Sequence, residues 1–264
     1  MKRIFFLFAC IFTILIAQNG FSQSNKLSFS LFGGYSIPTG DLKGDIIYNS
    51  TGNDATYLQS NGFNFGGAFK YALDRTGALQ LVVSVDYNAF SNSKDTTETI
   101  VIQGGKGTTT TSRTGKIKMN ILSANVGAQY NLMPNHKLNP YINLDFTNNF
   151  ISGDFTSTSN STTTGGITTT STSTGNLKSA WRGGLQFGAG IDFAVSPNIG
   201  IIVGGNYNLA NLIGKDSASS STANEYTLMD KETTIGSVTT AAKNISYLQL
   251  YAGISIYMNR KLLK

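Results

Sequence analysis

The stretch from Trp181 to Val195, WRGGLQFGAGIDFAV, alternates between two kinds of side chain along its whole length. The odd-numbered positions carry Trp, Gly, Leu, Phe, Ala, Ile, Phe and Val, whereas the even-numbered positions carry Arg, Gly, Gln, Asp and Ala. Successive side chains of a β-strand point to opposite faces. This period of two therefore predicts a strand with one apolar face and one polar or small face.

The same alternation recurs along the chain and predicts eight strands in all. The last segment, Tyr247 to Met258, shows it clearly, and the others lie at 27–35, 63–73, 79–87, 122–130, 141–146 and 201–209. Short polar turns at 74–76, 133–137 and 196–198 alternate with long polar connections at 38–61, 91–115, 155–179 and 214–243. An even number of strands with short turns at one end and long connections at the other is typical of an outer-membrane barrel.

The composition excludes several other classes of protein. The chain has 264 residues, of which 40% are hydrophobic and 13% charged. Few charges with an ordinary apolar content argue against a disordered chain. The only long apolar run is at the N-terminus, so no later segment is expected to cross a membrane as a helix. The formal net charge of +6 is scattered along the chain, so we expect no nucleic-acid partner.

The N-terminus has the pattern of a secretory signal peptide. Lys2 and Arg3 precede an apolar run from Ile4 to Ala17, and Gly20-Phe21-Ser22 follows as a small-residue cleavage site. We therefore assign residues 1–22 to the signal peptide and 23–264 to a single barrel domain. The only cysteine, Cys10, lies in the apolar run, so the mature chain is expected to have no disulfide and no cysteine nucleophile.

The mature chain resembles the small eight-stranded outer-membrane β-barrel family, which contains the OmpA-, OmpX- and OmpW-like transmembrane domains. The resemblance implies an all-β, eight-stranded antiparallel up-and-down transmembrane barrel with long extracellular hairpins. It also implies a monomer in the outer membrane of a Gram-negative cell, with both termini in the periplasm. Its partners would be the membrane lipid and the outer-membrane assembly machinery. The alternative is a secreted soluble barrel whose apolar face encloses a ligand.

The last strand resembles the assembly signal of outer-membrane barrels. The signal combines polar, glycine, apolar and aromatic positions, which are matched here by Tyr251, Gly253, Ile256 and Met258. Met258 stands where an aromatic residue is usual, but the two faces of the strand are preserved.

Five charged residues fall on the polar face of the predicted strands: Lys70, Asp86, Asp145, Arg182 and Asp192. A charge inside a barrel needs a partner, so we expect a structural network that pairs Lys70 with Asp145 or Asp192, and Arg182 with Asp86. A proton or ion path is the alternative.

Aromatic residues near the ends of the apolar face are expected to form membrane-interface girdles. They are Tyr35, Phe63, Tyr71, Tyr87, Tyr130, Phe150, Trp181, Phe193 and Tyr207.

The chain shows no pattern that indicates catalysis. Its one histidine, His136, lies in a short turn that we place on the periplasmic side. No spacing of His or Cys suggests a metal site, and the glycine pairs lie within strands rather than before a helix. We therefore expect no catalytic residues, no cofactor and no metal.

Two long connections are rich in serine and threonine and carry a glycine pair. Between Thr156 and Thr174, fifteen of nineteen residues are Ser or Thr. Hairpin turns at Gly104-Gly105 and Gly165-Gly166 would place Val85 opposite Ala124, and Phe150 opposite Trp181, with all four outward. β-Branched threonine favours strands, so we expect both connections to be projecting β-ribbons.

The predicted function is a non-enzymatic structural or surface-interaction role through these Thr/Ser-rich extracellular loops. An extracellular ligand or a surface protein would be the partner. The alternatives are a narrow channel for small solutes or ions, and an accessory role in the assembly of surface proteins. An eight-stranded barrel is just wide enough for side chains to fill its interior, which disfavours a wide pore.

Overall fold

The computed structural model describes residues 27–44, 57–101, 108–134, 136–163, 166–235 and 238–258. The predicted signal peptide and the Gly104-Gly105 turn lie outside the described residues. Within the described ranges, no helix is both long enough and apolar enough to cross a membrane.

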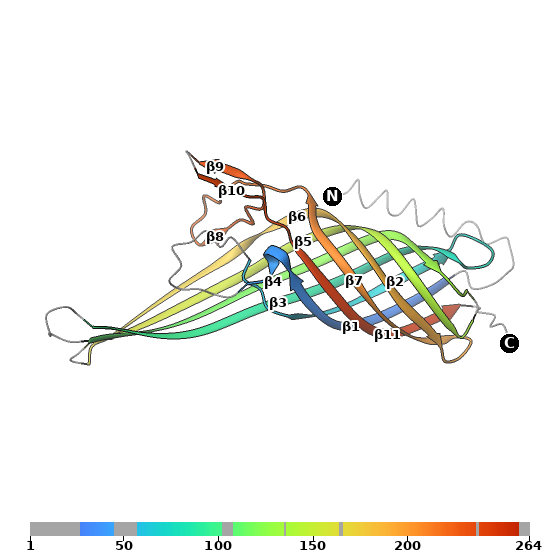
Figure 1. Ribbon diagram of the computed structural model, residues 1–264, viewed down its shortest axis with the longest axis horizontal. Coiled ribbons are helices and arrows are strands. Elements are labelled where there is room, and N and C mark those ends of the chain that lie inside the picture. The colour runs from blue at the N-terminus through green and yellow to red at the C-terminus, as the bar shows by residue number, and fades with distance from the viewer. Residues whose placement is uncertain are drawn as a thin grey trace.

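Eight long strands form a closed antiparallel barrel (Figure 1). They are β1 (Leu27–Thr39), β2 (Gly62–Ala72), β3 (Leu79–Val101), β4 (Thr108–Asn131), β5 (Leu138–Thr163), β6 (Thr168–Ala194), β7 (Ile199–Ile213) and β11 (Ser246–Met258). Each strand pairs with the next of these eight, and β11 closes the ring by pairing with β1. The predicted eight-stranded up-and-down topology is confirmed. The connections add a short 3-10 helix η1 (Gly40–Leu42), β8 (Glu225–Tyr226), β9 (Thr233–Ile235) and β10 (Val238–Thr240).

Closure of the ring fixes which face of each strand is buried. The apolar face points outward: Leu31, Phe65 and Ile254 are each 56% exposed. The polar face points inward, where Asn88, Ser30 and Gln249 are almost completely buried. A soluble barrel with an apolar interior would have the opposite arrangement, so that alternative is wrong. The outer face is a continuous apolar surface of the kind that lipid covers.

The two described ends of the chain lie at the same end of the barrel (Figure 1). Leu27 at the start of β1 pairs with Met258 at the end of β11. The short turns that follow β2, β4 and β6 lie at this end too, because each follows a strand that runs back toward it. The long connections therefore gather at the opposite end, which we call the rim.

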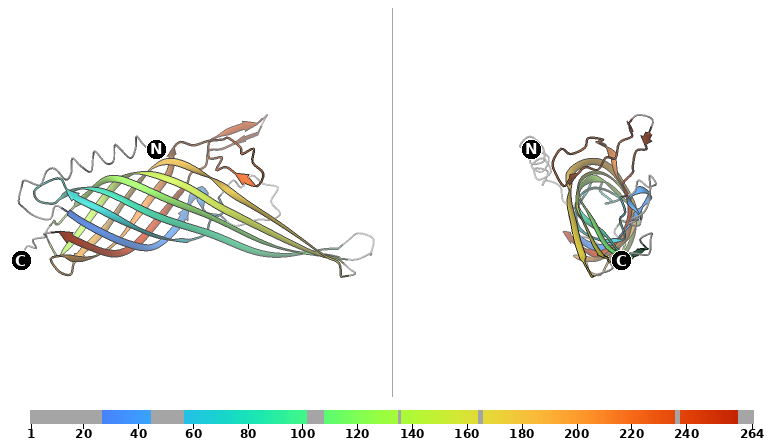
Figure 2. Two further views of the ribbon diagram at one scale, coloured as in Figure 1. Left: turned by 180° about the vertical axis from the view of Figure 1, so that it is seen from behind. Right: turned by 90° about the vertical axis from the view of Figure 1, so that its left-hand side faces the viewer.

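Four of the strands continue far beyond the rim. Strands β3, β4, β5 and β6 have 23, 24, 26 and 27 residues, whereas β1 and β11 have 13 each. Their outer parts form one projecting sheet (Figures 1 and 2). We call residues 91–101, 108–118, 153–163 and 166–179 the extended sheet. The Thr-rich connections are thus strands, as predicted.

The two hairpins are also joined to each other, which the sequence analysis did not predict. Strand β4 stays paired with β5 outward to Thr109 and Thr163, so the two hairpins share one hydrogen-bonded sheet. Only the outer strands of the four, β3 and β6, therefore keep a free edge. The pairing of Val85 with Ala124 is as predicted, and the same register continues to Val101 and Thr108.

The second hairpin has the predicted inner register and a shifted outer register. Phe150 pairs with Trp181, as predicted, but beyond Ile151 the register shifts so that Gly153 pairs with Leu177. Two residues of β6 then face one of β5, which is a β-bulge. At the tip, Thr163 N–H donates to the Ile167 carbonyl at 3.0 Å, and Gly166 has a φ of 81°. Thr163 is thus bonded to Ile167 and not paired with Thr168, as a turn at Gly165-Gly166 would require, and the bulge absorbs this shift of one residue. Residues 164 and 165 themselves lie outside the described residues.

Candidate functional site

All five charged residues assigned to the lumen lie inside the barrel. Lys70, Asp86, Asp145, Arg182 and Asp192 are each no more than 7% exposed. They come from β2, β3, β5 and β6, and their inward direction follows from the strict alternation of those strands. The sequence therefore predicted which charges are buried, but not how they are paired.

Arg182 pairs with Asp230, not with Asp86 as expected. Its Nε and Nη2 donate to the two carboxylate oxygens of Asp230 at 2.8 Å each, and both side chains are buried. Arg182 lies near the rim, where the connection after β7 folds over the barrel and brings Asp230 within reach. Asp86 lies deeper and accepts amide hydrogen bonds from Asn88, Asn125 and Gln249 at 2.8, 2.6 and 2.9 Å.

Asp230 is held by two further donors. Asn211 Nδ2 donates to it at 2.9 Å and the Asp216 N–H at 3.0 Å. Burial raises the pKa of the Asp230 carboxyl, but the hydrogen bonds from Arg182, Asp216 and Asn211 outweigh it and hold the pKa below its usual value. The carboxylate is therefore ionised at neutral pH. We call Arg182, Asn211 and Asp230 the latch, because they fasten the last long connection to the barrel.

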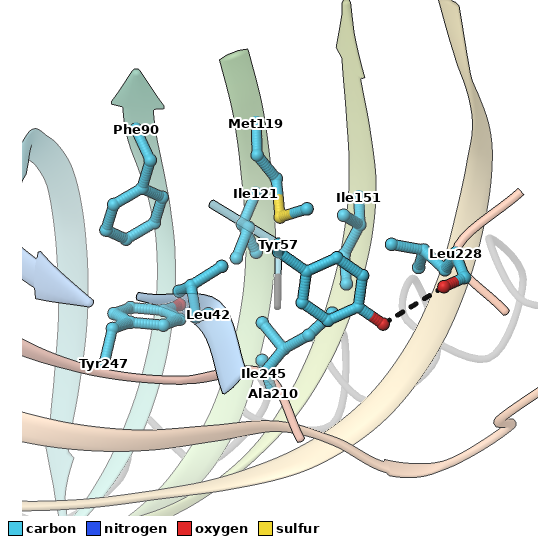
Figure 3. Close-up of a cluster of buried hydrophobic side chains, with 10 residues drawn as sticks. All are labelled: Leu42, Tyr57, Phe90, Met119, Ile121, Ile151, Ala210, Leu228, Ile245 and Tyr247. Atoms are coloured by element: carbon cyan, nitrogen blue, oxygen red, sulfur yellow. Dashed lines mark hydrogen bonds between the residues drawn. The ribbon is translucent and has the colours of Figure 1, made fainter. Parts of the chain in front are cut away.

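An apolar cluster of buried side chains lies beneath the rim (Figure 3). Its strand members are Phe90, Met119, Ile121, Ile151, Ala210 and Tyr247, and Leu42, Tyr57, Leu228 and Ile245 come from the first and last long connections. The Tyr57 hydroxyl donates to the Leu228 carbonyl at 3.2 Å and so ties these two connections together. We call these ten residues the plug.

Sequence reasoning missed the plug, although a signal for it was present. Phe90, Ile121 and Ile151 occupy positions whose parity is otherwise polar, so large apolar residues there indicate that the lumen turns apolar near the rim. Asp230 gave no such signal, because it lies in a long connection without periodicity.

Below the plug, the lumen is filled by polar and aromatic side chains around a cavity of about 40 Å³. Lys70 lines this cavity, and its Nζ lies 4.9 Å from the centre of the Tyr141 ring. The expected direct ion pair with Asp145 or Asp192 is not among those that the described residues form. The ammonium lies over an aromatic ring instead. Asp192 accepts a hydrogen bond from the Tyr257 hydroxyl.

The aromatic residues predicted for the membrane interfaces all point outward. Tyr35, Phe63, Tyr130, Phe150, Trp181 and Phe193 are exposed, and Tyr71, Tyr87 and Tyr207 are partly exposed. Tyr35 pairs with Phe63 across β1 and β2, and Phe150 with Trp181 across β5 and β6. Their contact with the membrane interface stays a prediction.

The residues of the assembly signal have the predicted parity. Tyr251 points inward and its ring packs 5.2 Å from that of Phe32, whereas Ile256 and Met258 are about half exposed on the outer face, at 47% and 54%. Gly253 pairs with Phe32. Nothing in this geometry tests recognition by an assembly machinery, so that role stays a prediction.

His136 lies exposed in the short turn after β4, at the end of the barrel opposite the rim. Within the described ranges, no group of three or more His, Cys, Asp or Glu side chains is arranged to hold a metal ion.

The extended sheet has a free edge that already holds one added strand. Beyond Gly183, the β6 ladder with β7 ends, while its pairing with β5 continues to the tip. Strand β8 adds to this edge in parallel at Asn176 and Leu177, and the Asn176 N–H donates to the Asn224 carbonyl at 2.9 Å. The Tyr226 ring packs edge-on against Phe155, 4.9 Å between centres, in space left open by Gly175.

Comparison with known proteins places this architecture in context. The family model described as outer membrane protein beta-barrel domain matches residues 17–214. Neisserial surface protein A is 15% identical, with 90% of this chain and 100% of that chain covered and a TM-score of 0.47. The attachment invasion locus protein Ail of Yersinia pestis, in complex with the heparin analogue sucrose octasulfate, is 13% identical, with 89% and 99% covered and a TM-score of 0.34. The comparison with curated protein sequences found no match.

Proposed function

Because the chain belongs to the outer membrane protein beta-barrel domain family, we propose that it is a non-enzymatic surface protein that binds a partner through its extended sheet. The barrel anchors the chain in the outer membrane, with both termini in the periplasm and the rim outside. The free edge of β6 is the observation that carries this proposal. The partner is a protein at the cell surface that contributes an extended strand.

The backbone of β6 offers hydrogen-bonding groups along this edge. N–H groups of an antiparallel strand point alternately to its two sides. Since the Asn176 N–H points to β8, those of Thr170, Thr172 and Thr174 point to the same side. Beyond β8, no described strand covers that side. An edge of this kind is a template for strand addition, and β8 is an example within the chain.

The side chains of the extended sheet favour a hydrogen-bonded partner over an apolar one. Thr158 and Thr172, and Thr162 and Thr168, face each other with hydroxyl oxygens 3.5 and 3.0 Å apart. These side chains are exposed or half-exposed, so the sheet has no apolar core of its own. Main-chain hydrogen bonds would supply affinity for an added strand, and the threonine ladders a stiff surface.

The plug and the latch support this role over that of a narrow channel. The plug fills the lumen beneath the rim, and the latch fastens the connection that completes it. A path for solutes would require both to open. The surface role requires no movement of the barrel.

The test is to block the free edge without changing the rest of the chain. Thr172→Pro removes one outward N–H, and proline is tolerated on the free side of an edge strand. Thr172→Ala is the matched control, because it removes the same hydroxyl and keeps the N–H. The readout is capture of surface proteins by intact cells, or cell aggregation, for each variant displayed at equal amount.

The proline variant should lose partner binding at least about tenfold, which corresponds to ~1.4 kcal/mol, while the alanine variant keeps it. Both should still show the heat-dependent gel mobility of a folded barrel. Equal binding by the two variants would mean that the β6 edge is not the contact. Binding by neither variant would assign recognition to the Thr172 hydroxyl instead.

A further inference from the structure

We propose that the lower lumen binds one small monovalent cation, Na⁺ or K⁺, in the cavity beside Asp145. The site is separate from the extended sheet and independent of the surface role. Three features of the described residues point to it: a surplus of negative charge, a wall of buried oxygen atoms and a space kept open by a glycine.

The surplus of charge follows from the pairing in the lumen. Of the five inward charged residues, Arg182 is neutralised by Asp230. Lys70 is then the one ammonium among the five to balance Asp86, Asp145 and Asp192. Uncompensated negative charge is costly away from bulk water, so uptake of a cation is favoured.

The wall of the cavity presents oxygen atoms. Four oxygens that have no hydrogen-bond partner among the described residues belong to residues lining it: Asn143 Oδ1, Asp145 Oδ1, Gln186 Oε1 and Asn206 Oδ1. The amide groups of Asn143 and Gln186 turn toward Asp145, donating to its Oδ2 at 2.6 and 3.5 Å. Their carbonyl oxygens are therefore left for another partner. Carboxylate and amide oxygens are the ligands that hard cations prefer.

Gly188 leaves room between two of these oxygens. It pairs with Asn143 of β5 on one side and Asn206 of β7 on the other. A Cβ on Gly188 would collide with Asn206 Oδ1 and lie 2.9 Å from Asn143 Oδ1. The two amide oxygens thus approach the same small space, which a side chain would fill.

The size and charge of the cavity select the ligand. A volume of about 40 Å³ admits an ion with one or two waters, since one water needs at least ~10–15 Å³, but no organic ligand. Asp145 is the one carboxylate among the lining residues, and the Lys70 ammonium lines the same cavity. A divalent ion such as Ca²⁺ usually requires more carboxylates, so a monovalent ion fits better.

The first test is thermal unfolding of the folded, detergent-purified protein in equal concentrations of NaCl, KCl or N-methyl-D-glucamine chloride. The large organic cation cannot enter the cavity and serves as the blank. The midpoint should be higher in Na⁺ or K⁺ by on the order of 5 °C, as expected for a cation at about 100 times its Kd. Equal midpoints in the three salts would overturn the proposal, because a water or a protonated Asp145 would then satisfy the site.

Matched variants locate the effect. Asp145→Asn and Asn206→Ala should lose the dependence on the cation. Asn64→Ala should keep it, because Asn64 has a buried oxygen without a described partner but does not line the cavity. Dependence that survives Asn206→Ala would place the ion elsewhere and overturn the site.

Crystals of the wild-type protein in RbCl decide the question even if the variants fail to fold. An anomalous peak between Asp145, Asn143 and Asn206 is expected. An ordered water at that position, with no anomalous signal, would show that the cavity is only hydrated.

Discussion

At the scale of single residues, Asp230 is the charged side chain through which the last long connection is bonded to the barrel. It is fully buried and receives hydrogen bonds from Arg182, Asn211 and the Asp216 backbone. Removing one member of a buried ion pair is costly, typically ~3–5 kcal/mol, because the other charge is left without a partner. If Asp230 is neutral, this cost is removed when the connection leaves the rim, because the Arg182 guanidinium is then exposed to water.

Asp230→Asn should therefore release the connection while the barrel stays folded. Trypsin should cut at Lys215, Lys231 or Lys243 at least about tenfold faster, because each ~1.4 kcal/mol of lost docking multiplies the open population by ten. Asp154→Asn is the control, since Asp154 forms only an exposed pair with Lys118 at 3.7 Å. Equal cleavage rates for the two variants would show that the latch does not hold the connection.

The latch should also open in acid. The pKa of Asp230 is lowered in the folded protein, so ionisation stabilises the docked state at pH above the ordinary value of an aspartate. That stabilisation is lost as the pH falls through the lowered, folded value. The fluorescence of Trp181, the single tryptophan, should report release of the connection. Gly214, at the start of that connection, lies so close to the indole ring that an added Cβ would be 3.0 Å from it. Its emission should change below about pH 4 in the wild type, and Asp230→Asn should show the opened signal already at neutral pH.

At the scale of elements, the alternation of apolar and polar residues predicted the barrel strands. It did not predict the structure of the connections, which have no such alternation. The alternation of residues 181–195 specifies a face for every side chain, and closure then leaves one topology. The outer register and the compensating bulge could not be predicted, because one register without a bulge and the shifted register with a bulge both place Phe150 opposite Trp181. The partner of Arg182 depends on how a thirty-residue connection folds back, which local pattern does not encode.

The extended sheet should be dispensable for folding. Deleting Thr156 to Thr174 removes residues that are mostly Ser and Thr and keeps Phe155 and Gly175, on which Tyr226 packs. The deleted chain should still show the heat-dependent gel mobility of a folded barrel, and its thermal unfolding midpoint should be similar to that of the wild type. Partner binding should be lost. Ile151→Ala in the plug provides the contrast and should cost ~2–5 kcal/mol, because it opens a cavity in a closed cluster. A deleted chain that fails to form a barrel would mean that the sheet takes part in folding.

At the scale of the whole molecule, we expect the rim to face the outside of the cell, because the two ends of the barrel are unequal. The turn at His136 is short, whereas the rim carries the extended sheet, and barrels of this class typically have short periplasmic turns and longer extracellular loops. The chain's only cysteine, Cys10, lies in the predicted signal peptide. An introduced cysteine would therefore be the only thiol of the mature chain that a maleimide can label. Thr172→Cys should react with a membrane-impermeant maleimide on intact cells, and His136→Cys only after permeabilisation. The reverse pattern would invert the orientation.

The last prediction is that the barrel does not conduct. Two obstacles lie in series: the plug beneath the rim, and the lower lumen, where Tyr141, Gln129 and Tyr251 line a cavity of about 40 Å³. Purified protein in planar bilayers should give no stable nanosiemens-scale currents, in keeping with the narrow interior of eight strands. Asp230→Asn should stay closed on that scale too, because opening the latch leaves the lower lumen filled. Stable large currents from the wild type would contradict both obstacles and favour the channel alternative. Such currents from Asp230→Asn alone would show that the latched connection is the gate.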